Sequence, residues 1–332
     1  MSPRVLVTGA SGFVGGHVAA SLRELRDPGG GGPEIRLLVR SAPEPSPGPE
    51  AVRADPDTPP GPEAVRADLT APETLRGVCD GVDVVLHCAS HVGSDERLTR
   101  AVNDHGTRAL VAEAVRAGVR RIVYVSTAAV YGRGPFTRAV PADLSPAPTS
   151  PTSRARAAAE RYVLDAGGVV LRPHLVLGTG DRWVVPGVAA LLGALGAPLK
   201  DCEARHSFVA VTALAKAVVT VGLAERSSVG LSEGLPDSAL TGAHHVNHPR
   251  PARTSELLEA ISRHLALPLP GAPLTVEEAR ATLRDQPRLL HHLDMLAVDH
   301  WFADDEWWGA VPGTGNGTGT ADVSVASCLG TP

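Results

Sequence analysis

The chain has few of the residues that indicate disulfide cross-links, metal sites or nucleic-acid contacts. No basic stripe is present, and 31 Lys and Arg against 36 Asp and Glu give a net charge of −5, which argues against a nucleic-acid partner. The four cysteines lack the spacing of a metal site or a redox pair, so we expect reduced thiols and no metal; they are Cys79, Cys88, Cys202 and Cys328.

Long apolar runs are also absent. No run reaches the about 18 residues of a membrane-spanning helix, and the first residues already have a strand pattern, so we expect neither a membrane span nor a signal peptide. Together with reduced cysteines, this predicts a cytoplasmic protein. A length of 332 residues, 43% of them hydrophobic, suits one large domain or two fused domains.

Three glycines at a spacing of three follow an apolar run at the start of the chain. Gly9, Gly12 and Gly15 stand between a strand pattern at 4–7 and a helical pattern at 17–22. In such a unit the first glycine permits a tight turn, the second admits a pyrophosphate, and the third lets the helix pack on the strand. A glycine turn without a ligand is the alternative. The motif predicts a dinucleotide site formed by Thr8, Gly9, Ser11, Gly12, Phe13, Val14 and Gly15.

Strand-like and helix-like patterns alternate through the first half of the chain. A helix is expected at about 103–117, and strands at 4–7, 35–39, 64–67, 82–87, 121–126 and 169–171. This alternation predicts an α/β protein with a Rossmann-type doubly wound parallel sheet. The nonapeptide PGPEAVRAD occurs at 47–55 and again at 60–68, and we interpret the first copy as a loop insertion.

The pattern changes after Pro173 to short helical pieces between Pro- and Gly-rich joints. We therefore expect a dinucleotide-binding domain at 1–172, with returns to the sheet near 207–221 and 244–248. A smaller, mostly helical substrate-binding domain is expected at 173–206 and 249–312. Residues 313–332 are rich in Gly and Thr without periodicity, which predicts a mobile tail.

Arg40 and Ser41 follow the second predicted strand. A carboxylate at this point suits the ribose hydroxyls of NAD, whereas an arginine suits the 2′-phosphate of NADP. Arg40 and Ser41 therefore favour NADP(H), an ordinary surface arginine being the alternative. Asp68 and Leu69, at the end of the third strand, are expected to border the adenine.

Together, these residues resemble the extended short-chain dehydrogenase/reductases, of the NAD-dependent epimerase/dehydratase type. The resemblance covers about residues 4–260 and implies cofactor contacts from Cys88, Ala89, Ser90, Arg156 and Pro173. Its landmarks are TGASGFVG (8–15), ADL (67–69), HCAS (87–90), NDHGT (103–107), VSTAAVYG (125–132), AAAE (157–160) and LRPHLVLGTGD (171–181).

The chain departs from that family at the catalytic positions. The resemblance implies a Ser or Thr, here Thr127, and a Tyr-x-x-x-Lys pair, but Thr152 and Arg156 stand where the Tyr and Lys are expected. A threonine hydroxyl does not titrate near neutral pH, and arginine stays protonated. Cofactor binding survives these changes, with Arg156 on the ribose, but the usual proton donor is lost.

A ketone with a neighbouring phenol can supply its own proton. We therefore expect a ketoreductase that uses NADPH to reduce a polycyclic aromatic ketone, with the substrate phenol or water as the proton source. His91 is a competing proton source, and Tyr131 is near the site at a position that is usually structural in the family.

Aromatic residues make up 3% of the chain, yet four of them lie close together near its end: Trp301, Phe302, Trp307 and Trp308. We expect these residues to form a local core. Alternatively, they and Trp183 together face a flat aromatic substrate. The other readings are a sugar-nucleotide epimerase or dehydratase, which depends more on the missing tyrosine, and a non-catalytic NADP-binding regulator. Because dimers are common in the family that the chain resembles, a homodimer is a further expectation.

Overall fold

The computed structural model describes residues 2–27, 31–40, 62–224, 237–303, 307 and 324–330. Ser41, Trp308 and the first copy of the repeat lie outside them. The chain divides into two compact units. Unit 1 comprises Met1–Ser126, Ser150–Val170 and Val218–Gly242, and unit 2 comprises Thr127–Thr149, Leu171–Ala217 and Ala243–Pro332.

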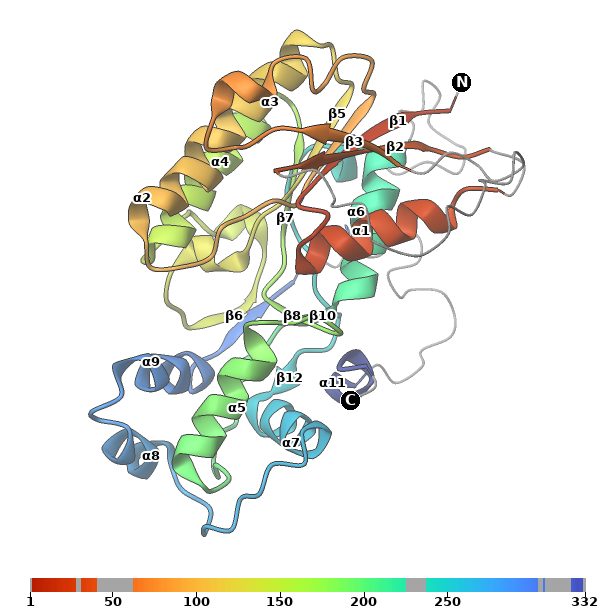
Figure 1. The fold of residues 1–332 in the computed structure, drawn as a ribbon. Helices are drawn as coiled ribbons and strands as arrows, with labels where there is room; N and C mark the ends of the chain where they lie inside the picture. The colour runs from red at the N-terminus through yellow and green to blue at the C-terminus, as the bar shows by residue number, and fades with distance from the viewer. Residues whose placement is uncertain are drawn as a thin grey trace, which may run out of the picture. The chain divides into compact units, whose positions relative to one another are not determined.

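The largest sheet among the described residues has seven strands, five of which lie wholly in unit 1 (Figure 1). In the order of the sheet, its strands are β11 (Gly242–His245), β7 (Val169–Arg172), β5 (Arg121–Val125), β4 (Val84–His87), β1 (Arg4–Thr8), β2 (Glu34–Val39) and β3 (Glu63–Arg66). β1 pairs in parallel with β2 and β4, as do β2 with β3 and β4 with β5. The prediction of a Rossmann-type doubly wound sheet is confirmed.

Helices cover both faces of this sheet. Figure 1 shows α1 (Phe13–Glu24) and α6 (Val211–Leu223) on one face, and α2 (Glu96–Thr99), α3 (Thr107–Arg116) and α4 (Pro151–Asp165) on the other. A Cβ on Gly222 of α6 would lie 2.6 Å from Leu86 Cδ2 of β4, so helix and sheet are in close contact. The central strands β1, β4, β5 and β7 are buried along nearly their whole length, which explains their largely apolar sequences, whereas β3 at the edge of the sheet is mostly exposed.

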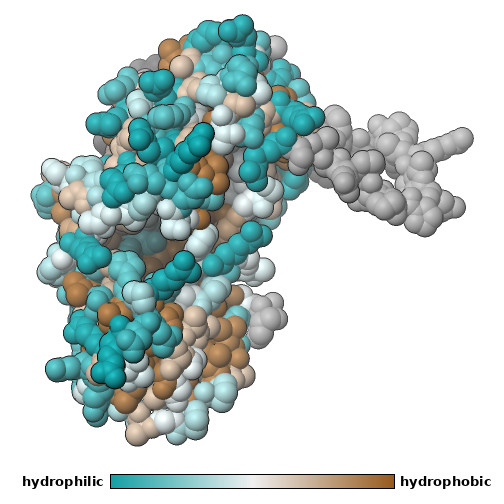
Figure 2. Space-filling view, turned by 60° about the vertical axis from the view of Figure 1, so that its left-hand side comes forward, coloured by the Kyte–Doolittle hydropathy of each residue, from teal (hydrophilic) through white to brown (hydrophobic). Residues whose placement is uncertain are grey.

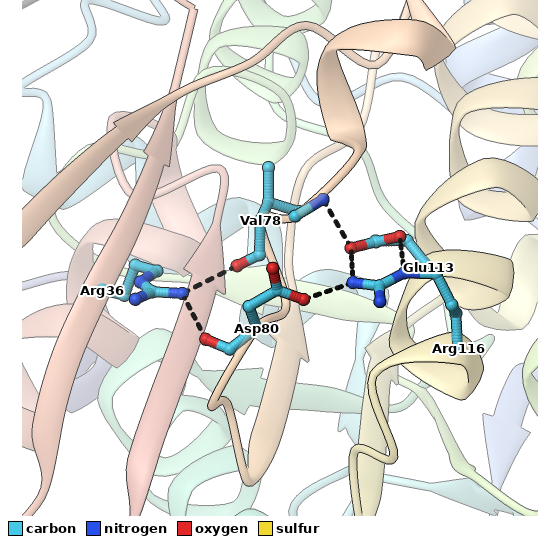
Figure 3. A network of polar contacts seen from close by, with 6 residues as sticks. Arg36, Val78, Asp80, Glu113 and Arg116 are labelled. Atoms are coloured by element: carbon cyan, nitrogen blue, oxygen red, sulfur yellow. Dashed lines mark hydrogen bonds and ion pairs between the residues drawn. The ribbon is translucent and has the colours of Figure 1, made fainter.

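A polar network fixes one flank of unit 1 (Figure 3). Arg36 on β2 donates to the carbonyl oxygens of Val78 and Asp80, at 3.1 and 3.0 Å. On α3, Arg116 bonds to the carboxylates of Asp80 and Glu113. Glu113 also accepts a 2.7 Å hydrogen bond from Gly77 N–H, and the bond from Arg116 is the main cause of its lowered pKa. The network ties the loop before β4 to β2 and α3.

Unit 2 contains two small sheets and the helices that pack against them. One sheet has the order β12 (Ala252–Arg253), β9 (Arg205–His206), β13 (His300–Phe302) and β6 (Phe136–Ala139), and the other pairs β10 (Phe208–Ala210) with β8 (Leu175–Leu177). Its helices are α5 (Val184–Leu195), α7 (Thr254–His264), α8 (Val276–Thr282), α9 (Pro287–Leu296) and α11 (Val325–Cys328). Their apolar faces share one buried cluster.

In the described part of the chain, five short helical turns accompany these helices and strands. They are the 3₁₀ turns η1 (Pro72–Leu75), η3 (Ala128–Tyr131), η4 (Pro141–Asp143) and η5 (Asp237–Leu240), and the π-helix η2 (Arg100–Gly106). The helix expected at about 103–117 is therefore a π-helix that continues into α3. A π-helical turn is rare and is found most often near functional sites.

One local expectation was wrong. Residues 207–221 do not return to the large sheet: β10 pairs with β8, and the apolar run that follows forms α6. A continuous apolar run does not reveal its period, but α6, at 13 residues, exceeds the roughly 4–8 residues of a buried strand, and this length was the signal for a helix. Most of the tail predicted at 313–332 lies outside the described residues; its described part, 324–330, carries α11, whose Val325 and Cys328 are buried with Leu329. The return near 244–248 occurs as β11.

In the part of the chain that the structure describes, no helix is long and apolar enough to cross a membrane. On the face shown in Figure 2, hydrophobic residues are interspersed with hydrophilic ones.

Candidate cofactor and active site

The glycine loop joins β1 to α1 in a geometry that excludes side chains at two positions. Gly9 has a φ of +71°, and a Cβ there would lie 2.7 Å from Ala89 Cα. A Cβ on Gly15 would lie 2.2 Å from the carbonyl oxygen of Gly9. The backbones of β1, α1 and the segment after β4 therefore approach one another as closely as the motif predicts.

The N-terminus of α1 can accept an anion. Gly12 precedes the helix, and no side chain caps it. The nearest neighbour of a Cβ at Gly12 would be Gly9 O, at 3.1 Å. Uncapped N–H groups and the positive end of the helix dipole favour a phosphate at such a terminus. The residues of the loop thus fit the pyrophosphate of a dinucleotide.

Beneath the loop, a buried chain of hydrogen bonds connects three elements. Thr8 Oγ1 lies 2.7 Å from His87 Nδ1, and His87 Nε2 lies 2.8 Å from Thr107 Oγ1. Burial first, and then the charge of Arg156, lowers the pKa of His87 to about 3, so this imidazole is neutral. Ala89 N–H donates to Thr8 Oγ1 at 3.2 Å. The carboxyl ends of β1 and β4 are held together.

Arg40 and Asp68 follow β2 and β3 at the same edge of the sheet. Arg40 is exposed. Asp68 Oδ1 accepts hydrogen bonds from the N–H and hydroxyl of Thr70, at 2.8 and 2.9 Å. The bond from Thr70 N–H is the main cause of the lowered pKa of Asp68, to which the charge of Arg40 also contributes. Leu69 packs against η2, where a Cβ on Gly106 would lie 2.6 Å from Leu69 O.

The segment after β4 is held by side chains from two helices. Asn103 of η2 accepts from His91 N–H at 2.7 Å and donates to His91 O at 2.8 Å. The Thr152 hydroxyl donates to Gly93 O at 3.2 Å. Thr152 is in position because α4 begins with a capping box between Ser150 and Ser153, with Pro151 in the first turn. The Thr152 hydroxyl therefore fixes a loop.

Arg156 lies one turn further along α4. Its Nη2 donates to Val125 O, and its Nη1 donates to Ser90 Oγ at 3.3 Å. The guanidinium carbon lies 5.9 Å from the centre of the Tyr124 ring. Cys88, two residues before Ser90, is no candidate nucleophile, because burial raises the pKa of its thiol to about 12.

Thr127, Pro173 and Tyr131 belong to unit 2. Thr127 Oγ1 accepts from Ala129 N–H at 3.2 Å as the cap of η3, and Pro173 O accepts from Ala128 N–H at 2.8 Å. The Tyr131 hydroxyl lies 2.8 Å from His245 Nε2 and accepts from Arg172 at 2.7 Å. With 3% of its surface exposed, Tyr131 is part of a buried polar network.

The aromatic residues expected to form a local core or to face a substrate differ in burial. Phe302 and Trp307 are buried, and Phe302 packs against Tyr131 and Phe136, as expected of a local core. Trp183, by contrast, is 56% exposed. Among the described residues, no group of His, Cys, Asp or Glu is arranged to hold a metal ion.

Comparison with known proteins identifies the family. The model of the NAD dependent epimerase/dehydratase family matches residues 5–230. The chain belongs to this family. A putative epimerase of Burkholderia cenocepacia is similar in fold, with a TM-score of 0.67, 20% identity, and 99% of this chain and 97% of that chain covered.

Two curated proteins are similar in sequence. One is the decarboxylating sterol-4-alpha-carboxylate 3-dehydrogenase of Saccharomyces cerevisiae, 30% identical over 55% of this chain and 54% of the relative. The other is the 4-hydroxy-2-methyl-3-oxo-4-farnesyl-3,4-dihydroquinoline-1-oxide ketoreductase of Stigmatella aurantiaca, 32% identical over 55% and 53%. The chain spans about half the length of these relatives.

Sequence reasoning gave no role to Asn103, Tyr124 or Glu160, which support the site. Glu160 accepts a hydrogen bond from Ser126, at the end of β5, and both side chains are buried. Asn103 and Glu160 belong to the family landmarks NDHGT and AAAE, so the resemblance could have pointed to them. The buried stacking of Tyr124 on His87, with ring centres 5.1 Å apart, had no signal in the sequence.

Proposed function

We propose that this epimerase/dehydratase-family protein is an NADPH-dependent ketoreductase. The observation that carries the proposal is the arrangement around Arg156: a fixed cation stands beside Ser90, in the segment after β4 that is expected to contact the cofactor, while the Tyr of the family's acid–base pair is absent. Reduction of a ketone needs that tyrosine less than epimerisation does, because hydride transfer comes before protonation. The ketoreductase relative supports the same class of reaction.

NADPH, when bound, supplies the hydride. The uncapped N-terminus of α1 would hold its pyrophosphate, Arg40 with Ser41 its 2′-phosphate, and Arg156 its nicotinamide ribose. Asp68 and Leu69 would border the adenine, and Cys88, Ala89 and Pro173 would contact the rest of the cofactor. Thr127 would orient the substrate carbonyl.

The proposed substrate is a ketone of an aromatic polyketide, of the angucyclinone kind, in antibiotic biosynthesis in the cytoplasm. The residue pattern resembles the angucyclinone ketoreductase of simocyclinone biosynthesis. A phenol beside the ketone, or water, would provide the proton, with His91 as the alternative. Exposed Trp183 is available for a flat ring system.

The direct test mixes the protein with NADPH and a hydroxylated polycyclic ketone and follows the nicotinamide absorbance. Oxidation of NADPH with formation of the alcohol supports the proposal. Tight NADPH binding without oxidation would instead favour the non-catalytic regulator. Conversion of a sugar nucleotide with no net change of cofactor would favour the epimerase.

A further inference from the structure

Ser90 is an exposed hydroxyl that the Arg156 guanidinium reaches. Arg156 Nη1 and Ser90 Oγ are 3.3 Å apart. A guanidinium has no acceptor, so the hydrogen bond runs from Arg156 to the serine oxygen. The serine O–H therefore remains available to donate a hydrogen bond, and the adjacent cation strengthens it as a donor.

The position of the cation is fixed from below. Arg156 Nη2 donates to Val125 O, and the guanidinium lies over the Tyr124 ring. That ring in turn stacks on His87, at an interplanar angle of 23°. His87 is hydrogen-bonded on both sides, so the support beneath Arg156 is buried and rigid.

The position of the hydroxyl is fixed as well. Ser90 lies between β4 and His91, whose backbone is held on both its N–H and its carbonyl by Asn103. Gly93 is held by Thr152. A donor whose backbone does not have to reorganise is the kind that stabilises developing charge most effectively.

We propose that Ser90 and Arg156 form a hydroxyl–guanidinium pair that binds the carbonyl oxygen of the substrate, in place of the family's Tyr and Lys. The proposal rests on the proposed function. It assigns the hydroxyl role to Ser90 because the Thr152 hydroxyl, at the tyrosine's place in the sequence, donates to Gly93 O instead.

The chemistry follows from this placement. With NADPH bound, a hydride would be delivered to the carbonyl carbon to form the new C–H bond, and the C=O π electrons would move onto oxygen. Ser90 O–H donates to that oxygen, while the positive charge of Arg156 stabilises the oxyanion. The oxyanion then takes a proton from the substrate phenol or from water, and the ketone is reduced to the alcohol as NADPH becomes NADP⁺.

The test compares Ser90→Ala with Ser94→Ala, an exposed serine of the same segment, and with Ser90→Thr, which keeps a hydroxyl. We expect Ser90→Ala to lower kcat by about 10²-fold, the usual effect of removing one donor to an oxyanion. The proposal places Ser90 on the substrate oxygen and not on the cofactor, where the family resemblance would put it, so the Kd of Ser90→Ala for NADPH should stay within about twofold of wild type. Ser94→Ala should behave as wild type, and Ser90→Thr should recover most of the lost rate.

A binding measurement separates this proposal from the proposed function. 2-Naphthol is titrated into the NADP⁺ complex, because its oxygen mimics that of the product. If wild type binds 2-naphthol, Ser90→Ala does not, and no NADPH is oxidised, the binding role of the Ser90–Arg156 pair is supported and the ketoreductase activity is rejected. If the protein reduces the ketone and Ser90→Ala does so at the same rate, the role of the Ser90–Arg156 pair is rejected and the ketoreductase activity is supported. If there is neither turnover nor Ser90-dependent binding, both proposals are rejected.

Discussion

The Thr152 hydroxyl donates a hydrogen bond to the Gly93 carbonyl oxygen over 3.2 Å, so the residue at the tyrosine's place in the sequence holds a loop. Thr152→Ala should therefore keep kcat within about threefold of wild type. The Thr152 hydroxyl also accepts a hydrogen bond from Gly93 N–H at 3.4 Å, and loss of these two exposed bonds should lower the free energy of unfolding by about 0.5–1.5 kcal/mol each. Steady-state kinetics and urea unfolding measure the two effects.

Thr152→Ser is the matched control, since it keeps the hydroxyl and should retain the stability. A loss of more than about 10²-fold in kcat for Thr152→Ala, with the fold unchanged, would instead indicate a general acid.

Arg40 should determine the preference between NADPH and NADH. Its exposed guanidinium follows β2, where the 2′-phosphate of NADPH is expected. Arg40→Ala should weaken NADPH binding by about tenfold or more, the value of a charge-assisted hydrogen bond, and leave NADH binding unchanged. Fluorescence titration with each cofactor measures this, with exposed Arg97→Ala as the control. Equal losses for both cofactors would show that Arg40 does not contact the 2′-phosphate.

Two glycines of the loop should respond differently to alanine. A Cβ at Gly15 would lie 2.2 Å from Gly9 O, so Gly15→Ala should destabilise unit 1 and abolish cofactor binding. At Gly12 the nearest contact would be 3.1 Å, so Gly12→Ala should fold normally and bind NADPH more weakly. Thermal unfolding and cofactor titration of the pair distinguish the two effects. Unchanged NADPH affinity in folded Gly12→Ala would argue against a pyrophosphate at this point.

Stability should fall in mildly acidic solution because of buried histidines. Burial lowers the pKa of His87 to about 3 and that of His206 to about 4, from an ordinary value of 6.5. The unfolded chain then binds more protons than the folded chain below pH 6.5, so stability is lost as the pH falls from there toward 4. Between pH 7 and pH 5 each histidine should remove about 2 kcal/mol.

Urea unfolding at the two pH values tests this dependence. His206→Gln should show a smaller difference between pH 7 and pH 5 than wild type, because glutamine does not titrate. Replacing exposed His105 by Gln is the control. An unchanged pH dependence in both His206→Gln and His87→Gln would disprove the assignment.

The end of the chain should contribute to the core of unit 2. Leu329 is 4% exposed and packs in the cluster formed by α5, α7, α8, α9 and α11. Leu329→Ala should reduce the free energy of unfolding by about 2–4 kcal/mol. Differential scanning calorimetry measures the loss, with exposed Ala326→Ser as the control. A wild-type transition for Leu329→Ala would show that this segment is dispensable for the fold.

Sequence alone determined the α/β class, the strands of the large sheet and the glycine loop, because these depend on local periodicity and on steric limits at single glycines. It also showed that Thr152 and Arg156 replace the expected Tyr and Lys. Only the tertiary structure decided what these two side chains contact. Thr152 meets Gly93, and Arg156 meets Ser90, across 59 and 66 residues of sequence. The packing of α4 against the segment after β4 creates both contacts, and no local pattern encodes that packing.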